Sequence, residues 1–377
     1  MPLNTIPNKG LTSRGYPSDR ITTPIIINGD MQVAQRGAGP SGAFSGSGYS
    51  EGPDRFRHGI SNLGSWKTAQ STTVPTGQGF SKSFKIECST ADASPAASDE
   101  AAINYRLEGQ NVQSLKKGTS NAEAVTIAFW VRSTKTGTHI VELFDADNSR
   151  TVSQAYTVSS SNTWEKKVLN FPADTTGALD NDNARSLQIN FWLGAGSNFT
   201  SGTLATTWAS QTNANRAVGQ VNLADSTSNE WYITGLQMEV GEFDSTTIPS
   251  FPFESHENNL KKCMRYFQQM GNNGAMDDTA TQAGTRFLQG QREGSDNATA
   301  KCICPLLVPL RTNPTISKND INFRQDGSNT DFNSMSCRNF GNVLEITVSN
   351  TSNFNTGESM MIRSTSADSY LRFDSEL

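Results

Sequence analysis

Apolar and polar side chains alternate along several short segments between Ile25 and Phe253. These segments are rich in β-branched and aromatic residues, and turn-forming clusters such as "DADNS" and "DTTGALDNDN" separate them. A period of two is typical of strands with one buried face, and this composition favours strands over helices. We predict strands over residues 124–133, 139–145, 164–171, 186–194 and 230–240.

The order of these strands also predicts the fold class. No segment repeats at a fixed period, which disfavours a β-helix or a propeller. Many short strands joined by polar turns are typical of an antiparallel two-sheet sandwich of the jelly-roll type. We expect an all-β protein with an extended N-terminal arm, a jelly-roll β-sandwich and then a smaller C-terminal β-sandwich.

The alternating pattern breaks at Pro249 and Pro252, and both residues interrupt strand pairing. A length of 377 residues exceeds that of a usual single domain, although one large all-β domain is an alternative. We expect a connector over residues 244–258. The predicted domains are then the jelly roll at 25–253 and the small β domain at 254–377.

A helical spacing follows the connector. Ser255 can cap a short helix, and the apolar residues behind it recur at the intervals of one helix face. They are Leu260, Cys263, Met264 and Phe267. The segment "CMRYFQ" from Cys263 also alternates, so a strand that begins there is the alternative.

Residues 1–24 carry four prolines and two glycines, a spacing that prevents regular secondary structure. This composition favours an extended arm that lies on another protein, with a frayed terminus as the alternative. At the start of the sandwich, Met31 and Val33 suit one face of an opening strand, and Arg36 is expected to reach a carboxylate such as Asp54.

Composition and charge exclude several kinds of partner. The net charge is −5 and no run of Lys or Arg stands out, so we expect no nucleic-acid partner. The longest apolar runs are too short to cross a membrane, and the first 20 residues lack the apolar stretch of a secretory signal, so synthesis in the cytoplasm and no membrane insertion are expected. The five cysteines are scattered without a CxxC pair, which disfavours a disulfide framework or a zinc site. Cys302 and Cys304 are expected on one strand face.

Five motifs in a fixed order resemble a family of bacteriophage and prophage virion proteins, the tail-fibre or appendage proteins. The resemblance covers roughly residues 25–377 and is carried by the order of the motifs. They are "INGDMQVAQRG" (27–37), "GPDRFR" (52–57), "ITGLQMEVGE" (233–242), "FPFESHENNLKKCMRYFQ" (251–268) and "VPLRTNPTIS" (308–317). The chain departs from the family pattern at Ala34 and Phe56, where tryptophan is expected. This difference weakens the expectation that those two positions form a sugar-binding platform.

The resemblance implies a virion structural protein with a jelly roll similar to carbohydrate-binding modules. Its expected partners are a host-surface glycan or receptor and, through the arm, other virion proteins. It also implies a homotrimer in the virion, with avidity from repeated weak sites. The alternative is an architectural role without a ligand, as a capsid decoration, cement or tail-connecting protein.

Motifs of enzymes are absent from the sequence. It lacks HExxH, GxSxG, P-loop and dinucleotide fingerprints, and the three histidines are far apart. A non-enzymatic protein is therefore expected. A glycan depolymerase stays a less favoured alternative, because two carboxylates from distant strands would suffice for that chemistry.

Sugar binding uses exposed aromatic rings, so the surroundings of each tryptophan matter. Trp66 and Trp208 lie in polar, turn-rich segments and are the predicted glycan contacts, with packing under their own loops as the alternative. The other four tryptophans lie within strand patterns and are assigned to the core. They are Trp130, Trp164, Trp192 and Trp231.

Two acidic turns offer hard oxygen ligands at alternating positions. The candidate ligands of a structural calcium ion are Asp145 and Asp147 in "FDADNS" and Asp180 and Asp182 in "LDNDN". Asp also favours tight turns for local reasons, so a purely structural role is the alternative. No other cofactor is expected.

Overall fold

The computed structural model describes residues 24–271, 286–292, 299–325, 328–330, 334–349, 359–364 and 369–377. The predicted arm over residues 1–24 lies outside the described residues, apart from Pro24. The described chain is nearly all β, and its antiparallel sheets confirm the predicted fold class.

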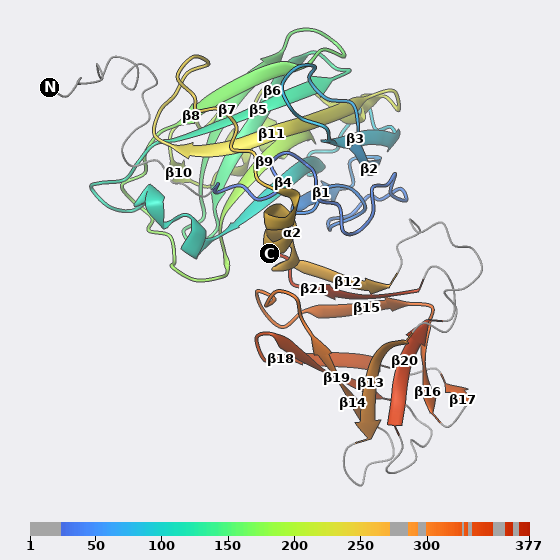
Figure 1. Cartoon of the computed structure of the whole chain (residues 1–377). Helices are drawn as coiled ribbons and strands as arrows, with labels where there is room; N and C mark the ends of the chain where they lie inside the picture. The colour runs from blue at the N-terminus through green and yellow to red at the C-terminus, as the bar shows by residue number, and fades with distance from the viewer. Residues whose placement is uncertain are drawn as a thin grey trace, which may run out of the picture.

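Two sheets form the first sandwich (Figure 1). The six-stranded sheet has the order β1-β4-β9-β6-β7-β10. Its strands are β1 (Phe56–Ser61), β4 (Glu100–Glu108), β9 (Arg185–Ala195), β6 (Gly137–Asp145), β7 (Arg150–Val158) and β10 (Ala209–Ser210). The five-stranded sheet has the order β2-β3-β11-β5-β8. Its strands are β2 (Ser65–Ser71), β3 (Ser83–Thr90), β11 (Glu230–Val240), β5 (Val125–Ser133) and β8 (Glu165–Phe171).

The core of this sandwich lies between the two sheets, as the alternation along the strands requires. In β9, Leu187, Ile189 and Phe191 belong to the core, and the side chains between them point to the outer face. All five segments predicted as strands are strands, with ends that differ by one or two residues.

The C-terminal sheets enclose a second core, which includes Cys302 and Cys304 on one face of β14, as predicted. The three-stranded sheet consists of β12 (Phe267–Gly271), β21 (Tyr370–Asp374) and β15 (Thr315–Asn319). The larger sheet consists of β17 (Ser328–Thr330), β16 (Ile321–Gln325), β20 (Ser359–Ser364), β13 (Arg286–Arg292), β14 (Thr299–Pro305), β19 (Val343–Ser349) and β18 (Ser334–Asn339), in that order.

Helix α2 (His256–Met264) connects the two parts. Ser255 Oγ accepts a hydrogen bond from Asn258 N at 3.3 Å, so the predicted cap is confirmed. The helix contains Cys263, and the strand begins only at Phe267. The buried helix residues are Cys263 and the polar Asn259. The remaining helices are single turns: α1 (Ser197–Thr200), η2 (Gly109–Asn111), η3 (Gln113–Leu115), η4 (Asn213–Asn215) and η5 (Leu223–Asp225).

The opening strand predicted at Met31 and Val33 is wrong. Residues 28–31 form a tight turn in which Met31 N donates to Asn28 O at 3.0 Å, and Met31 has a positive φ of 62°. The Asn28 side chain accepts from Val33 N at 2.9 Å and donates to Val33 O at 2.8 Å. These local bonds take the backbone groups that a strand ladder would need.

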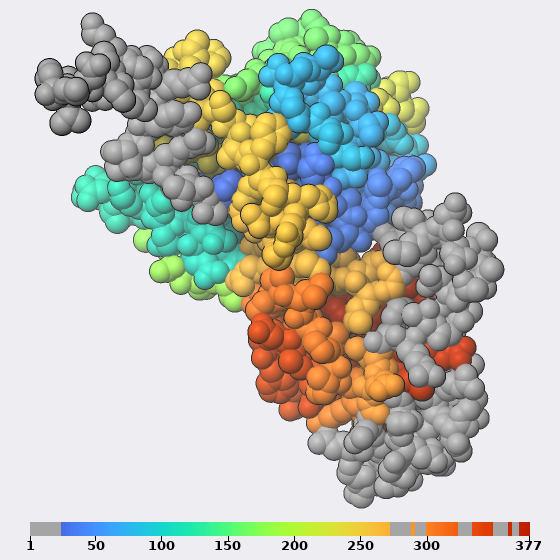
Figure 2. All heavy atoms as spheres, viewed as in Figure 1, coloured from blue at the N-terminus to red at the C-terminus, as the bar shows by residue number. Residues whose placement is uncertain are grey.

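The end of the chain returns to the sandwich and makes a buried ionic junction. Arg36 lies 4.0 Å from Asp54, which confirms the predicted pair, and its other nitrogen lies 2.9 Å from Asp374. Arg55 is ion-paired with Glu376, and both side chains are almost completely buried. Figure 2 shows the two lobes meeting around the gold segment that contains α2.

In the described part of the chain, no helix has the length and apolar character needed to cross a membrane.

Candidate functional site

Two hollows of very different size lie on the described surface. One is at the junction beside α2 and has a cavity volume of about 20 Å³. The other is a groove on the outer face of the six-stranded sheet, with a cavity volume of about 190 Å³. A single water needs roughly 10–15 Å³ measured in this way, so the first holds about one water and the second holds a small organic group.

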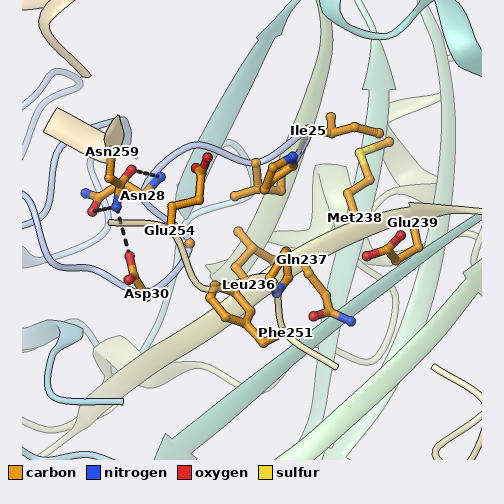
Figure 3. Close-up of a pocket in the computed structure, with 14 residues that line it drawn as sticks. Ile25, Asn28, Asp30, Leu236, Gln237, Met238, Glu239, Phe251, Glu254 and Asn259 are labelled. Atoms are coloured by element: carbon orange, nitrogen blue, oxygen red, sulfur yellow. Dashed lines mark hydrogen bonds between the residues drawn. The ribbon is translucent and has the colours of Figure 1, made fainter. Parts of the chain in front are cut away.

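The junction pocket is a structural feature (Figure 3). Asn259 of α2 accepts from Asn28 N at 2.9 Å and donates to Asp30 Oδ1 at 3.0 Å. Burial raises the pKa of Asp30 from its ordinary value. These bonds attach the helix to the first turn of the sandwich and occupy the polar groups that a ligand would need.

The groove is built by the polar half of the strand alternation. Its residues come from β1, β4 and β9 and from two loops beside them. They are Ser47, Arg57, Gly59, Glu100, Ala102, Asn104, Arg106, Gln188, Asn190, Trp192 and Arg216. It extends along β4 from Glu100 to Arg106, roughly 20 Å at about 3.3 Å per residue.

A row of hydrogen-bonded side chains crosses the middle of the groove. Arg57, Asn104, Asn190 and Glu142 lie opposite one another on four adjacent strands. Arg57 donates to Asn104 Oδ1 at 3.2 Å, Asn104 donates to Asn190 Oδ1 at 2.7 Å, and Asn190 donates to Glu142 Oε2 at 2.9 Å. Each member fixes the orientation of the next, so the row is pre-organised.

One end of the groove has an aromatic wall. Trp192 is buried at its wall and packs against Phe199 of α1, with ring centroids 5.6 Å apart. The floor beside it consists of Gly59 and Ala102, two small residues that leave the space open. A Cβ at Gly59 would lie 2.6 Å from Asn104 Oδ1, so a larger residue there would displace the amide.

The two carboxylates near this end differ in their surroundings. Glu142 is 0% exposed, and Arg216 donates to both of its oxygens at 2.7 and 3.0 Å. Trp192 Nε1 also donates to Glu142, at 3.2 Å. Glu100 is half-buried, and burial together with the nearby Glu142 raises its pKa although Arg216 lowers it. Glu142 is therefore a structural anion, and Glu100 is the carboxyl group open to the groove.

The prediction that Trp66 is an exposed glycan contact is wrong. Trp66 is 0% exposed and belongs to the core of the first sandwich. Its indole nitrogen donates to Leu63 O at 2.7 Å, so a backbone carbonyl satisfies the polar group of the buried ring.

Trp208 packs against the core and against neighbouring loops, so a glycan contact at this ring stays a prediction. The ring is half-buried against the core, and its nitrogen donates to Pro172 O at 2.9 Å. The Lys117 ammonium lies 4.6 Å from its centroid. Trp208 does not line the groove, so the structure does not bring it together with Trp66 at one site.

The predicted calcium ligands do not form a metal site. Lys117 is ion-paired with Asp145 and lies 2.9 Å from Asp174. Its ammonium also donates to Gly177 O at 2.8 Å, and its side chain is 3% exposed. A protein cation therefore occupies the oxygen-rich place that a metal ion would take.

The other three aspartates are turn residues. Asp147 accepts from Asp180 N at 2.9 Å, and Asp182 accepts from Ala184 N at 2.9 Å. Within the described ranges, no group of three or more His, Cys, Asp or Glu side chains is placed to hold a metal ion. The four residues do not fit calcium, and local turn formation explains their positions.

The sequence contained a signal for the groove. In β4 and β9 the residues that alternate with the core are Asn104, Arg106, Gln188 and Asn190, which are costly on a strand face unless solvated or bonded. The core assignment is confirmed for Trp231 and Trp192, which are 0% and 2% exposed, although Trp192 belongs to a separate small core on the outer face and also lines the groove. Trp130 and Trp164 are only half-buried.

No protein-family model matches the sequence, and no curated protein is similar to it in sequence. Solved structures with a similar fold include a tailspike domain and carbohydrate-binding modules. The enzymatically active domain of tailspike protein 4 of bacteriophage CBA120 is 14% identical over 58% of this chain, with a TM-score of 0.29. The chain spans about a fifth of that protein, at 21% of its length.

Two carbohydrate-binding modules show comparable likeness. TmCBM61, in complex with β-1,4-galactotriose, is 8% identical over 57% of this chain and 97% of the module, with a TM-score of 0.27. The family 11 module of the Clostridium thermocellum cellulase Lic26A-Cel5E is 10% identical over 57% of this chain and 95% of the module, with a TM-score of 0.27. Scores this low describe a loose likeness among β folds and carry no functional conclusion.

Proposed function

We propose that the chain is a non-enzymatic virion protein, a tail fibre or appendage, whose polar groove binds a glycan on the host surface. The observation that carries the binding role is the row from Arg57 to Glu142, with its amides and guanidinium groups fixed at the floor of an open groove. Amide and guanidinium groups donate to and accept from sugar hydroxyls, and a row fixed in advance loses little entropy when a ligand binds.

The order of the five sequence motifs supports the virion role. A homotrimer would repeat the groove three times, so that weak single sites give an avidity roughly 10²–10⁴ above one site. The arm over residues 1–24 is the proposed contact with other virion proteins. The architectural alternative, a cement or connecting protein, predicts no ligand in the groove.

A glycan-cleaving activity is the second candidate, because Glu100 has a raised pKa and lies near Glu142. That chemistry needs a second carboxylate that can reach the sugar or a water. Glu142 is fully buried and accepts four hydrogen bonds, which favours binding over cleavage. Release of reducing ends from host polysaccharide, abolished in Glu100→Gln, would support cleavage instead.

The test fills the groove without touching its polar row. Ala102→Trp places an indole in the floor, and Ala155→Trp adds the same ring at an exposed position of β7 on the same sheet. On an array of bacterial-surface glycans, we expect the wild type and Ala155→Trp to bind the same sugars. We expect Ala102→Trp to lose binding at least about tenfold while retaining the wild-type circular dichroism spectrum.

Equal binding by both variants would place the ligand elsewhere on the molecule. Absence of binding to every glycan, by a wild type that is incorporated into particles, would favour the architectural role.

A further inference from the structure

Three guanidinium groups lie on the side of the groove away from Trp192: Arg57 and Arg106 line it, and Arg185 lies beside it. Arg57 donates to Asn104 Oδ1 at 3.2 Å. Arg106 and Arg185 both donate to Gln188 Oε1, at 2.8 and 3.1 Å. Both side-chain acceptors are neutral amides, and Arg106 also contacts Leu377 O. We call Arg57, Arg106 and Arg185 the arginine cluster.

The arginine cluster differs from five other partly or fully buried arginines of this protein. Those five bond an Asp or Glu carboxylate: Arg36, Arg55, Arg150, Arg216 and Arg265. Arg311 is similar to the cluster, because it donates to backbone carbonyl oxygens. Within the described residues, no member of the cluster forms an ion pair with an Asp or Glu side chain. The cluster therefore holds three positive charges together, with an oxygen of the last residue, Leu377, and the Glu376 carboxylate beside Arg106, on a chain whose net charge is −5.

The charge in the cluster is partly shielded from water. Burial and then repulsion from Arg57 and Arg185 lower the pKa of Arg106 to about 10. Burial and the nearby Arg185 also lower the pKa of Arg57. Like charges held together in a partly dry site are unfavourable, and a bound anion relieves that repulsion.

The arginine cluster also has N–H donors beyond those used in the hydrogen bonds given above. A guanidinium group carries five N–H donors in a planar fork, and Arg57 uses one of its nitrogens, on Asn104, among the described residues. The fork geometry matches the two oxygens of a carboxylate or phosphate. The groove continues from this cluster along the amide row to the aromatic wall at Trp192.

We infer that the groove selects an acidic glycan, with the anionic group of the sugar on the arginine cluster and its hydroxyls along the row of Asn104 and Asn190. This inference rests on the proposed glycan-binding function. It narrows the ligand class to sugars that carry a carboxylate, such as uronic or sialic acids, or an equivalent sulfate or phosphate.

The experiment compares matched sugars on one array. Oligosaccharides that contain uronate or sialate are printed beside their carboxyl-reduced neutral counterparts, and sulfated and phosphorylated sugars form two further sets. We expect wild-type binding to the acidic member of at least one pair, and binding to its neutral member at least about tenfold weaker, because charge-assisted hydrogen bonds are lost.

Three variants test the residues. Arg57→Gln and Arg106→Gln remove one charge each from the cluster, and we expect them to reduce acidic-glycan binding about tenfold while keeping the wild-type melting temperature within a few degrees. Arg132→Gln removes the same charge from the five-stranded sheet, where Arg132 bonds Asn162 and lies over the Tyr232 ring, 4.8 Å from its centroid. That control should bind like the wild type.

Equal affinity for the acidic and neutral members of every pair would overturn this inference and leave the proposed function intact. An equal loss of acidic-glycan binding in Arg132→Gln would overturn it as well, because the attraction would then come from overall charge. Failure to bind any sugar on the array would contradict both the inference and the proposed function. Preference for the sulfated or phosphorylated set, lost in the cluster variants, would support the anion site and identify its source.

Discussion

At the scale of single residues, polar neighbours in the sequence do not reveal whether a ring is exposed. Trp66 lies among Ser, Gly and Lys, yet it is fully buried because its indole nitrogen finds a carbonyl inside the turn. Trp192 lies in an apolar strand pattern, yet it faces outward toward the groove. Periodicity identified the strands, but whether a side chain is buried also depends on whether other elements cover its face of the sheet.

Replacing the two tryptophans separates these environments. We expect Trp66→Ala to lower the free energy of unfolding by about 3–5 kcal/mol, the usual loss for a buried aromatic residue. Trp208→Ala should lower it by about 1–2 kcal/mol, since its ring is only half-buried. Urea unfolding measures both values. A smaller loss for Trp66→Ala than for Trp208→Ala would contradict the burial described here.

Stability at mildly acid pH depends on buried histidine. Burial lowers the pKa of His139 to about 4, so the folded protein holds this residue neutral. The unfolded chain takes up a proton near pH 6.5, so the contribution of His139 is complete above pH 6.5 and is lost as the pH falls toward 4. Relative to His139→Phe, the wild type should lose on the order of 3 kcal/mol between pH 7 and pH 4.

The difference between the two proteins is the quantity to measure, by urea unfolding at several pH values. His58 also has a pKa lowered to about 4, whereas burial raises the pKa of Asp54 to about 6. The contribution of Asp54 has the opposite pH dependence and grows as the pH falls, because the folded protein keeps a proton on Asp54 that the unfolded chain releases. A difference that stays constant from pH 7 to pH 4 would show that His139 is not buried neutral.

At the scale of elements, the acidic turns are organised by a side chain from another loop. Although burial would raise it, hydrogen bonds from Arg150 and Lys117 hold the pKa of Asp174 at about 2. The sequence predicted calcium at Asp145, but the cation that pairs with this carboxylate is Lys117. Its partner residues are far apart in the chain, so spacing alone could not identify it.

Removing the ammonium tests this arrangement. We expect Lys117→Ala to lower the free energy of unfolding by about 3–5 kcal/mol, because Asp145 is left buried without its counter-ion and Asp174 keeps Arg150 alone. Millimolar calcium should raise the melting temperature of Lys117→Ala, since two carboxylates and carbonyl oxygens remain. Calcium or a chelator should leave the wild type unchanged. A wild-type melting temperature that falls on chelation would restore the calcium prediction.

At the scale of the whole molecule, the motifs that carry the family resemblance meet at the junction. They supply Asn28 and Arg36, Arg55, Asn259 and Arg311, which tie the first sandwich to α2 and to the end of the chain. The resemblance therefore concerns how the two parts are joined. Among the groove residues, Arg57 ends the second motif, whereas Asn104 and Asn190 belong to none of the motifs, so the motifs include one residue of the groove but not its amides.

The junction makes a prediction about the two-domain division. Glu376→Gln leaves Arg55 and Arg36 buried without their shared carboxylate, which costs about 3–5 kcal/mol. Because each part has its own core, we expect calorimetry to resolve two transitions in this variant. Glu257→Gln removes an exposed carboxylate and should cost less than about 0.5 kcal/mol. Identical traces for the two variants would argue against a junction of this strength.

The central claim is that the groove on the six-stranded sheet binds a glycan. The most direct measurement is a crystal structure of the protein with the sugar that binds best in the array. We predict electron density for the sugar along β4 and β9, within hydrogen-bond distance of Asn104, Asn190 and at least one residue of the arginine cluster. Density for the sugar at Trp208, at the junction pocket or on the C-terminal sheets, with the groove empty, would contradict the claim.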